Sequence, residues 1–486
     1  MNFKNKYFPF LIVFFLFTLS CSKTDNDIPQ DLELNNFIWK GLNAFYLWQE
    51  DINDLKDTRF NNQNELNTYL SGFPVPENLF ESLLNRPTDR FSVIVDDYIA
   101  LENSFQGLNL SSGMEFGLRQ YENASNNVYG YVRYVIPNSS AASNNVMRGQ
   151  VFNNVDGSQL TLDNYRSLLF GNNTNFTIGL ADYNNGNPLT NGTSISLSKT
   201  ELQENPIAIS KVIEDNNQKI GYLMYNQFAG NFDAQLNSVF ADFKTENIDN
   251  LIIDLRYNPG GFVSSATYLG GMITAQFEGE LFSQQIWNSK VTQAWDAERF
   301  INNFTNEIIN SDRNGNIVLQ ENLNTLGLNK VYFIVTNSSA SASELLINSL
   351  NSYIDVRVIG TTTTGKQEGS VTLYDSDNLS RTGANLNTNH TYAMQPIVFE
   401  ISNKDGINYP GGIIPGSGAF PGVSLPEDYG NLGVLGERSD PLLNETLTYI
   451  ATGAKGFTKV DISLFKEVFS SKLANPAKDN MIVQLK

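Results

Sequence analysis

Three short apolar segments, separated by helical stretches, constrain the fold of this 486-residue chain more than any other feature. They are Leu251–Arg256, Val331–Val335 and Val356–Gly360. Each is largely apolar on both faces, which is typical of strands buried between two layers. The pattern predicts an α/β region with a helix-covered sheet. In such folds functional groups are expected where strands give way to loops.

Two regions of different character precede this one. Residues 37–104 open with apolar and aromatic side chains at three- and four-residue spacing, which predicts a small helical domain. Residues 105–200 change to short β-like runs separated by Asn, Gly and Ser, which predicts a β-rich domain. The α/β region spans 201–450, and 451–486 is expected to be a C-terminal segment packed on it. The expected fold class is therefore multidomain, α+β combined with α/β.

The N-terminus has the pattern of an export signal. Two lysines precede an apolar run at residues 8–19, which is shorter than the roughly 20 residues that a bilayer-spanning helix needs. We therefore predict a signal peptide at residues 1–20. Cys21, the only cysteine, follows a small residue, and this pattern resembles the lipobox of bacterial lipoproteins. A chance cysteine beside a cleavage site is the alternative.

The lipobox resemblance implies that Cys21 is lipidated and becomes the mature N-terminus. The polar residues at 21–36 would then form a tether between the lipid and the first domain. The implied location is the cell envelope, as a membrane-anchored lipoprotein of the outer membrane that faces the periplasm or the surface. Its contact with the membrane would be made through the lipid.

The charge and the scarcity of metal-binding side chains exclude several classes of function. A formal net charge of −19 does not favour binding to a phosphate backbone, so we expect no nucleic acid partner. A single cysteine excludes disulfides and zinc–thiolate sites along the chain. A single histidine, His390, excludes a two-histidine metal site. We therefore expect neither a metal nor a cofactor.

A serine-rich segment at residues 337–344 follows the second apolar strand and enters a predicted helix. Ser341 in this position can expose its Oγ while the first free N–H groups of the helix face the same space. Such donors suit an oxyanion that develops during acyl transfer. Ser341 and Glu344 also satisfy the S-x-x-E capping box, so a structural role explains this motif when it is taken alone.

A nucleophilic serine needs a base, and the sequence offers two. Lys366 follows the third apolar strand, and a buried lysine with a lowered pKa can populate the neutral amine near pH 7. A Ser-His-Asp triad would have to use His390, but the surrounding residues 385–391 contain no carboxylate. Lys366 is therefore the favoured base, although a solvated loop charge is its commoner role.

Three motifs in order give the chain a specific resemblance. They are the strand end at Asp254–Gly261, the serine segment around Ser341, and Gly365-Lys366. In this order and at this spacing they resemble the C-terminal-processing (tail-specific) serine peptidases, over about residues 37–450. The resemblance implies a crotonase-like peptidase core and an acyl-enzyme reaction on polypeptide substrates.

Carried over by position, the resemblance makes Ser341 the nucleophile and Lys366 the general base. It places the oxyanion donors at the backbone N–H of Ala342 and of a glycine in the pair Gly260 and Gly261.

The third catalytic position departs from the family pattern. The family usually has a glutamine four residues beyond the lysine, where it orients the amine. This position is Ser370 here, whereas a two-residue insertion would align Thr372. Either hydroxyl can hydrogen-bond an amine, so both are candidates for the third member.

The β-rich region resembles a PDZ domain. A glycine-flanked loop and strand at 113–118 are followed by another strand, a short Ser-Ala-Ala helix and a strand that ends in Asp-Gly. PDZ modules add a peptide strand to a sheet edge and hold its terminal carboxylate on backbone N–H groups. The candidate peptide-binding residues are Gly113, Phe116, Gly117 and Leu118.

Taken together, the motifs predict a serine endopeptidase that acts near substrate C-termini. A non-catalytic peptide-binding lipoprotein that retains the scaffold is the alternative, because the third catalytic position is atypical. A phosphate-binding loop at 360–366 is disfavoured, since Gln367 stands where a magnesium ligand is needed and strand-like residues follow.

Overall fold

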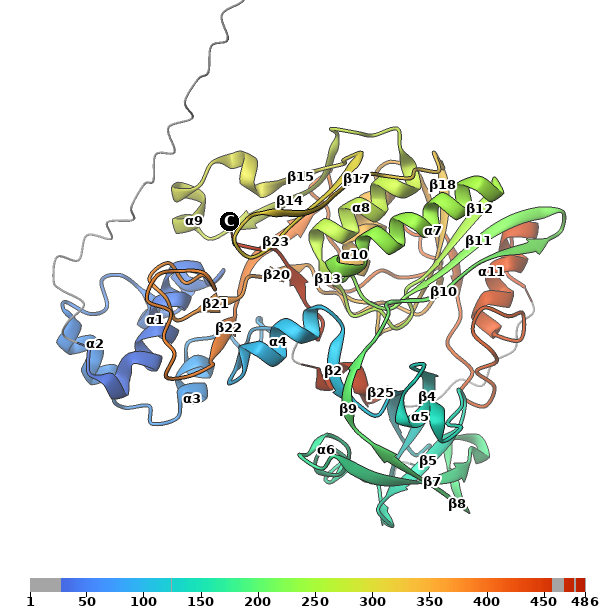
Figure 1. Ribbon diagram of the computed structural model, residues 1–486, viewed down its shortest axis with the longest axis horizontal. Helices are drawn as coiled ribbons and strands as arrows, with labels where there is room; N and C mark the ends of the chain where they lie inside the picture. Colours follow the sequence, from blue (N-terminus) through green and yellow to red (C-terminus); the bar gives the residue numbers. More distant parts are fainter. Residues whose placement is uncertain (1–27, 124, 457–466, 476–477, 486) are drawn as a thin grey trace, which may run out of the picture.

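The computed structural model describes residues 28–123, 125–456, 467–475 and 478–485 (Figure 1). The predicted signal peptide, Cys21 and the first part of the predicted tether lie outside these residues. The described chain forms a helical N-terminal region, a β-rich region and a larger α/β region. No described helix is long and apolar enough to cross a membrane.

The N-terminal region is helical, as its residue spacing predicted. Its helices are α1 (Glu33–Phe45), α2 (Gln63–Leu70), α3 (Pro76–Ser82) and α4 (Tyr98–Phe105). Phe37, Ile38 and Leu42 of α1 are buried and belong to the main hydrophobic core. The side chains of Asn62 and Asp97 accept N–H groups of the first turns of α2 and α4, which fixes where these helices begin.

A small sheet joins the N-terminal region to the rest of the chain. Its strands, in order, are β1 (Val93–Val95), β22 (Ala393–Gln395) and β21 (Leu373–Tyr374). Because β21 and β22 belong to the α/β part of the sequence, this sheet fixes the N-terminal helices against the region that contains Lys366.

The β-rich region has a sheet and a core of its own. Its strands run in the order β25 (Glu467–Ser470), β3 (Met114–Gln120), β4 (Val128–Val135), β5 (Val151–Val155), β7 (Asn175–Asp182) and β8 (Leu189–Ser198), and β6 (Ser158–Gln159) pairs with β5. Two short helices, α5 (Ser140–Ser143) and α6 (Tyr165–Phe170), contribute to its core. The edge strand β25 comes from the C-terminal end of the chain.

The α/β region is built on a six-stranded sheet. Its strands run in the order β10 (Ile207–Asp215), β11 (Gln218–Tyr225), β12 (Asn250–Asp254), β18 (Lys330–Val335), β19 (Asp355–Gly360) and β24 (Gly422–Ser424). All neighbours from β11 to β24 are parallel, and β10 is antiparallel to β11. The three apolar segments recognised in the sequence are therefore adjacent parallel strands, β12, β18 and β19.

Helices cover both faces of this sheet (Figure 1). They are α7 (Asp233–Glu246), α8 (Val263–Thr274) and α10 (Ala342–Asn351) on one face and α11 (Pro441–Thr452) on the other. Neighbouring residues enter different cores: Leu223 and Ile253 pack with the first three helices, whereas Tyr222 and Ile252 pack with α11. This alternation is the physical reason why the strands are apolar on both faces.

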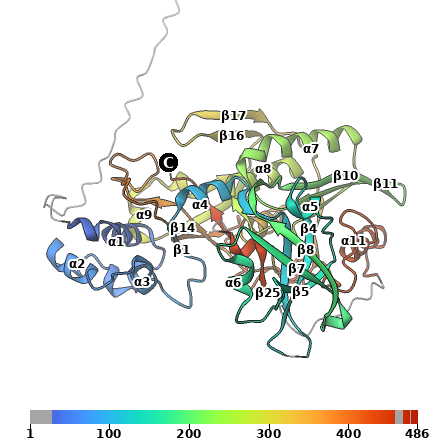
Figure 2. The same ribbon diagram turned by 60° about the horizontal axis from the view of Figure 1, so that its bottom comes forward.

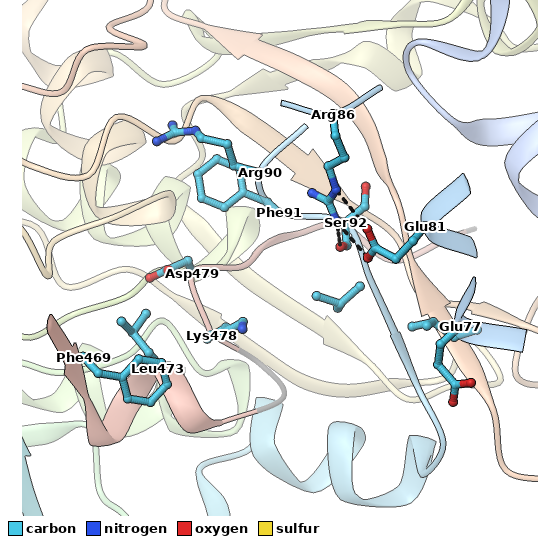
Figure 3. A pocket seen from close by; sticks show the side chains of 12 residues that line it. Glu77, Glu81, Arg86, Arg90, Phe91, Ser92, Phe469, Leu473, Lys478 and Asp479 are labelled. Carbon is cyan, nitrogen blue, oxygen red and sulfur yellow. Dashed lines mark hydrogen bonds and ion pairs between the residues drawn. The ribbon is translucent and has the colours of Figure 1, made fainter. Parts of the chain in front are cut away.

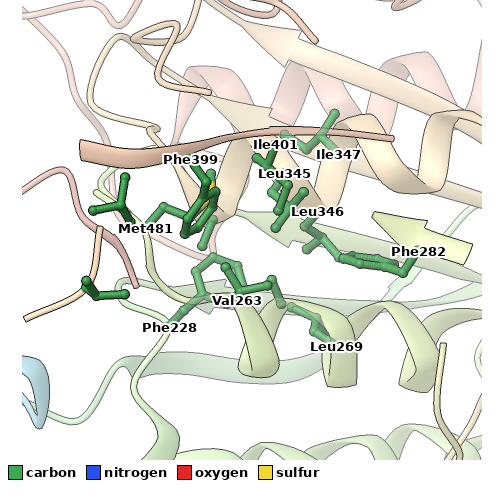
Figure 4. Close-up of a cluster of buried hydrophobic side chains, with 14 of the residues drawn as sticks. Phe228, Val263, Leu269, Phe282, Leu345, Leu346, Ile347, Phe399, Ile401 and Met481 are labelled. Atoms are coloured by element: carbon green, nitrogen blue, oxygen red, sulfur yellow. The ribbon is translucent and has the colours of Figure 1, made fainter. Parts of the chain in front are cut away.

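A second six-stranded sheet lies against α8 and α10. Its strands run in the order β13 (Gly261–Phe262), β26 (Met481–Ile482), β20 (Glu368–Ser370), β23 (Ile397–Ser402), β14 (Leu281–Trp287) and β15 (Ile301–Asn303). Figure 4 shows Leu345 and Leu346 of α10 facing Phe399, Ile401 and Met481 in the cluster that joins these layers. The C-terminal end of the chain thus supplies a strand to this sheet as well.

The remaining described α-helix and strands belong to none of these four sheets. They are α9 (Ser289–Ala294), the pair β2 (Leu108–Ser111) with β9 (Thr200–Gln203), and the hairpin β16 (Glu307–Ser311) with β17 (Ile317–Asn322). The C-terminal segment, expected to pack on the α/β region, contributes β25 to the β-rich sheet and β26 to the second sheet. It therefore connects the two regions.

Candidate active site

Ser341 stands between β18 and α10 in a strained conformation. Its backbone φ is 64° and its ψ is −116°, a region that residues other than glycine rarely adopt. The residue is fully buried, and its Oγ has no hydrogen-bond partner among the described residues. An unpartnered buried hydroxyl and a strained backbone each cost about 1–3 kcal/mol. Their coincidence is typical of a functional residue.

The carboxylate of Glu344 connects the serine segment to the loop that carries Lys366. It accepts the N–H of Ser341 at 2.9 Å, the N–H of Gly365 at 2.7 Å and the N–H of Lys366 at 2.9 Å. It also accepts the hydroxyl of Thr363. Burial raises the pKa of Glu344 to about 7, although these four donors favour the charged form. Glu344 therefore fixes the backbone on both sides of the candidate dyad.

The side chain of Lys366 is fully buried. Desolvation lowers its pKa to about 8, against the opposing effect of nearby carboxylates, of which Asp479 is the strongest. The Nζ lies 4.7 Å from the centre of the Phe91 ring and donates to the backbone carbonyl of Asp479. It makes no hydrogen bond to Ser341 Oγ, which is without a partner in the described part of the chain. The electrostatics of a base are present, but the contact with the nucleophile is not formed.

The loop after β12 is fastened to the serine segment by Asn258. The Asn258 side chain donates to the carbonyl of Tyr225 at 2.8 Å and accepts the N–H of Gly260 at 2.9 Å. Its own carbonyl accepts the N–H of Ala340 and the hydroxyl of Ser343, both at 3.1 Å. The two loops, which are distant in sequence, therefore hold each other in place beside Ser341.

Gly260 and Gly261 occupy positions that no other residue fits. Their φ angles are 110° and 136°. A Cβ at Gly260 would lie 2.6 Å from Ser341 Cβ, and one at Gly261 would lie 2.1 Å from the carbonyl oxygen of Phe228. The N–H of Gly261 donates to the carbonyl of Asn480 at 2.6 Å. The N–H of Gly260 is held by the Asn258 side chain of its own loop, whereas that of Gly261 is held by a carbonyl of the C-terminal segment. Gly261 is therefore the candidate oxyanion donor whose N–H a movement of that segment would free.

Ala342 is the first residue of α10, so its N–H has no carbonyl partner within the helix. It follows Ser341 directly and is fully buried. Its position beside the nucleophile suits a second oxyanion donor.

The charged residues of the first motif have a structural role in this fold. Arg256 is fully buried, with NH2 2.6 Å from Asp254 and NH1 2.8 Å from Asp440. The ion pairs hold the end of β12 against the start of α11. Removing one partner of such a buried pair leaves an uncompensated charge, which typically costs about 3–5 kcal/mol.

The two candidates for the third catalytic position differ in their surroundings. Ser370 is fully buried, and its Oγ has no hydrogen-bond partner within the described ranges. The hydroxyl of Thr372 accepts the Nε2 of Gln395 at 3.1 Å, and the Oε1 of Gln395 accepts the Nδ2 of Asn480 at 2.7 Å. Sequence reasoning missed Gln395, Asn480, Phe91 and Asp479, because no motif or spacing connects them to the serine segment.

His390 is engaged elsewhere. Its Nε2 lies 3.1 Å from Asp375 Oδ2, and its ring stacks on Phe37 of α1 with the centroids 6.5 Å apart. Because Ser341 Oγ has no partner among described residues, His390 does not form a triad with it.

The segment 360–366 does not have the geometry of a phosphate-binding loop. The amides that such a loop would offer at Gly365 and Lys366 are occupied by Glu344, and the strand β20 follows where such a loop needs a helix.

The candidate peptide-binding residues lie at the edge of the β-rich sheet. Gly113 has a φ of 81°, and a Cβ there would lie 2.0 Å from the Cβ of Ser139. Phe116, Gly117 and Leu118 belong to β3, and β25 pairs with the edge of β3 that β4 leaves open.

Within the described residues no group of three or more His, Cys, Asp or Glu side chains is arranged to hold a metal ion.

Comparison with known proteins adds family information to this geometry. The family model "Peptidase family S41" matches residues 219–399, which include Ser341 and Lys366, and "Peptidase S41 N-terminal domain" matches residues 33–93. A crystal structure from Bacteroides fragilis, described as an S41 protease, superposes with a TM-score of 0.63 at 21% identity. The match covers 86% of this chain and 98% of that one, so the two share a fold.

Two curated relatives match shorter parts of the chain. A carboxyl-terminal-processing protease of Picosynechococcus sp. is 28% identical over 15% of this chain, and a CtpA-like serine protease of Staphylococcus epidermidis is 24% identical over 34%. The matched segments span only 17% and 29% of those relatives. With both domain models matched in order, the chain belongs to peptidase family S41, with the family's N-terminal domain preceding its catalytic region.

Proposed function

We propose that this protein is a serine endopeptidase that cleaves polypeptides near their C-termini, with Ser341 as nucleophile and Lys366 as general base. The observation that carries the proposal is the buried amine of Lys366, whose pKa is lowered to about 8. Its backbone shares the Glu344 carboxylate with Ser341, a strained residue with an unpartnered hydroxyl in the described structure. A base with a lowered pKa and a strained nucleophile, both held by one carboxylate, favour catalysis over a structural role.

In this mechanism the neutral Lys366 amine takes the proton of Ser341 Oγ as Oγ attacks the carbonyl carbon of the scissile bond. The N–H groups of Gly261 and Ala342 stabilise the negative charge on the carbonyl oxygen. The tetrahedral intermediate collapses to an acyl ester of Ser341, and the Lys366 ammonium protonates the departing amine. A water molecule, deprotonated by Lys366, then hydrolyses the ester and restores both side chains.

The mechanism requires Lys366 to change partners. Its Nζ donates to the carbonyl of Asp479 and must turn to Ser341 Oγ before the proton can move. The four-carbon stem of lysine permits this rotation. The buried hydroxyl of Ser370 is the available group to orient the amine in its second position.

The β-rich region supports a PDZ-like role in holding the substrate. Gly113 makes a tight turn in front of β3, and β3 accepts an additional antiparallel strand at its edge. Backbone pairing at a sheet edge recognises extended polypeptide of varied sequence, as a processing enzyme requires.

The proposal includes an envelope location with Cys21 as the lipid anchor. It is supported by the signal-like pattern before Cys21. Expression in a bacterium that processes lipoproteins should place the wild type in the membrane fraction and Cys21→Ser in the soluble fraction. Equal partition of the two would remove the anchor from the proposal.

The second candidate is a binding protein that keeps the scaffold without turnover. It is favoured by the serine or threonine at the third position and by the absence of a Ser341–Lys366 hydrogen bond between these described residues. The experiment that separates the two compares wild type and Ser341→Ala on an unstructured peptide with a free C-terminus, with folding checked by thermal unfolding. Turnover by wild type alone supports the peptidase; equal, negligible turnover by two folded proteins supports the binder.

A further inference from the structure

The described C-terminal residues 467–475 and 478–485 contact two places where a substrate would bind, the edge of β3 and the candidate active site. At the first surface β25 adds to the edge of β3, with Phe469 opposite Leu118 and Ser470 opposite Gly117 in antiparallel register. Figure 2 shows β25 beside α6 in the β-rich region. This is the geometry in which sheet-edge domains bind peptide ligands. The chain's own end therefore occupies the edge that a bound peptide would use.

Side chains reinforce this pairing. The ring of Phe469 lies 5.1 Å from that of Phe170 and 5.7 Å from that of Tyr165, both on α6. The guanidinium of Arg166 lies 4.4 Å above the Phe469 ring. Phe469 is nevertheless only half-buried, so it fills an aromatic site at the surface of the β-rich region rather than a position in its core.

Polar contacts hold the segment on both sides of Phe469. Glu467 pairs with the buried Arg133 at 2.6 Å, and Lys472 pairs with Glu204 at 2.6 Å. The guanidinium of Arg133 also donates to the hydroxyl of Ser338 at 2.9 Å. Ser338 belongs to the serine segment, so the docked Glu467 is connected through one side chain to the neighbourhood of Ser341.

The same chain end then enters the candidate active site. The carbonyl of Asp479 accepts from Lys366 Nζ, and the carbonyl of Asn480 accepts from the N–H of Gly261 at 2.6 Å. Both acceptors are backbone carbonyls, the group that any polypeptide substrate presents. They engage the proposed base and the proposed oxyanion donor, while Ser341 Oγ is left without a partner among the described residues.

A cavity of about 500 Å³ lies beside this path (Figure 3). Phe469, Leu473 and Asp479 of the C-terminal segment line one part of it, and Arg90 and Phe91 line another. Two of these lining residues contact the proposed base: the Phe91 ring centre lies 4.7 Å from Lys366 Nζ, and the Asp479 carbonyl accepts from it. The cavity therefore provides open space beside Asp479.

We propose that the C-terminal segment is an intramolecular occupant of the substrate path, bound as a competitor at the β3 edge and at Lys366. A polypeptide substrate displaces β25 from β3 and draws Asp479 and Asn480 away from Lys366 and Gly261. This frees the amine to reach Ser341 and the Gly261 N–H to bind the oxyanion. The inference rests on the proposed peptidase function. It assigns to residues 467–475 and 478–480 the autoinhibition of that activity.

The strands β25 and β26 of the segment differ in how far they can be altered without unfolding the protein. β26 lies between β13 and β20 inside the second sheet, so its removal would damage the fold. β25 has one neighbour, β3, and can be released or locked with less damage. The experiment therefore acts on β25 in the full-length chain.

The test locks β25 to β3 with a disulfide. Phe469→Cys and Leu118→Cys are combined in a Cys21→Ser background, because directly opposed residues in an antiparallel pair come close enough for this bond. Peptide turnover by the oxidised variant should be at least 20-fold lower than after reduction, and Cys21→Ser alone should not respond to the reductant. Disulfide formation is checked by mass and folding by thermal unfolding. Equal turnover by the oxidised and reduced forms, both folded, would overturn the proposal.

A second measurement does not depend on catalysis. A fluorescent peptide with the sequence of residues 467–485 is titrated into the same variant, and binding is read by anisotropy. It should bind the reduced form and bind the oxidised form at least 20-fold more weakly, with a scrambled peptide as control. If neither wild type nor reduced variant turns over substrate, the peptidase proposal fails and this measurement alone decides the role of the segment. Equal peptide binding by the two forms would reject that role.

Discussion

The backbone N–H groups of Ser341 and Lys366 donate to the same carboxylate oxygen, Glu344 Oε2, each at 2.9 Å. The nucleophile and the base of the proposed dyad are thus positioned by one buried side chain. Their relative placement does not depend on a direct bond between them. The Lys366 side chain can therefore donate to the Asp479 carbonyl while Glu344 keeps the Lys366 backbone next to that of Ser341.

Glu344→Gln should lower kcat/KM by about 100-fold and the free energy of unfolding by about 1–3 kcal/mol. An amide has one acceptor oxygen, and its NH₂ group would face the N–H donors that the carboxylate accepts, leaving buried donors unpaired. Steady-state kinetics and urea unfolding measure the two effects. The exposed Glu278→Gln is the matched control and should change neither. Wild-type kinetics in Glu344→Gln would contradict the positioning role.

Peptidase activity should rise with pH through the pKa of Lys366, about 8, and level off above it. The sign follows because only the neutral amine accepts the Ser341 proton, and burial lowers the pKa so that this form is populated. Turnover of a neutral peptide between pH 6 and 10 measures the profile. Lys366→Arg, which stays charged throughout, should be inactive at every pH. A profile that is flat between pH 7 and 9 would exclude a lysine base.

The same shift predicts a pH-dependent stability. Between about 8 and 10.5 the unfolded chain binds more protons at Lys366 than the folded chain, so the free energy of unfolding should rise with pH in that window. The full shift corresponds to a rise of about 3 kcal/mol. Urea unfolding of wild type and Lys366→Met at pH 8 and pH 10 isolates this contribution, because other titrations are common to both proteins. An identical pH dependence in the two would show that folding does not lower the pKa of Lys366.

Gly260→Ala should abolish turnover. The new Cβ would lie 2.6 Å from Ser341 Cβ and 2.7 Å from the Asn480 carbonyl, at a φ of 110° that alanine does not tolerate. We expect a loss of at least 100-fold in kcat with a lowered melting temperature. Gly411→Ala is the matched control, since a Cβ there meets open space, and it should behave as wild type. Full activity in Gly260→Ala would show that this glycine does not border the reacting atoms.

Ser370→Ala should lower kcat by about 10-fold, whereas Thr372→Val should change it by less than about 3-fold. The Ser370 hydroxyl is buried and unpartnered in the described structure and so is free to orient the Lys366 amine, while Thr372 is already bonded to Gln395. The pH profile distinguishes orientation from stability: an orienting group should also shift the apparent pKa of the base. The reverse order of effects would assign the third position to Thr372.

The sequence by itself determined the elements and the positions of the candidate dyad. Apolar residues on both faces of residues 251–256, 331–335 and 356–360 are required by burial between two helical layers, and the structure forms adjacent parallel strands there. Parallel strands present their carboxyl ends at one edge of a sheet, and functional groups were expected where these strands give way to loops. The catalytic roles of Ser341 and Lys366 remain predictions.

Only the tertiary structure brought Asp479 and Asn480 to Lys366 and Gly261, and β25 to β3. These contacts are made by backbone carbonyls and by strands of two to four residues, which have no periodicity and no side-chain signature. Any residue type can supply a carbonyl, so the contacts of Asp479 and Asn480 follow from the path of the folded backbone and not from the identity of these two residues.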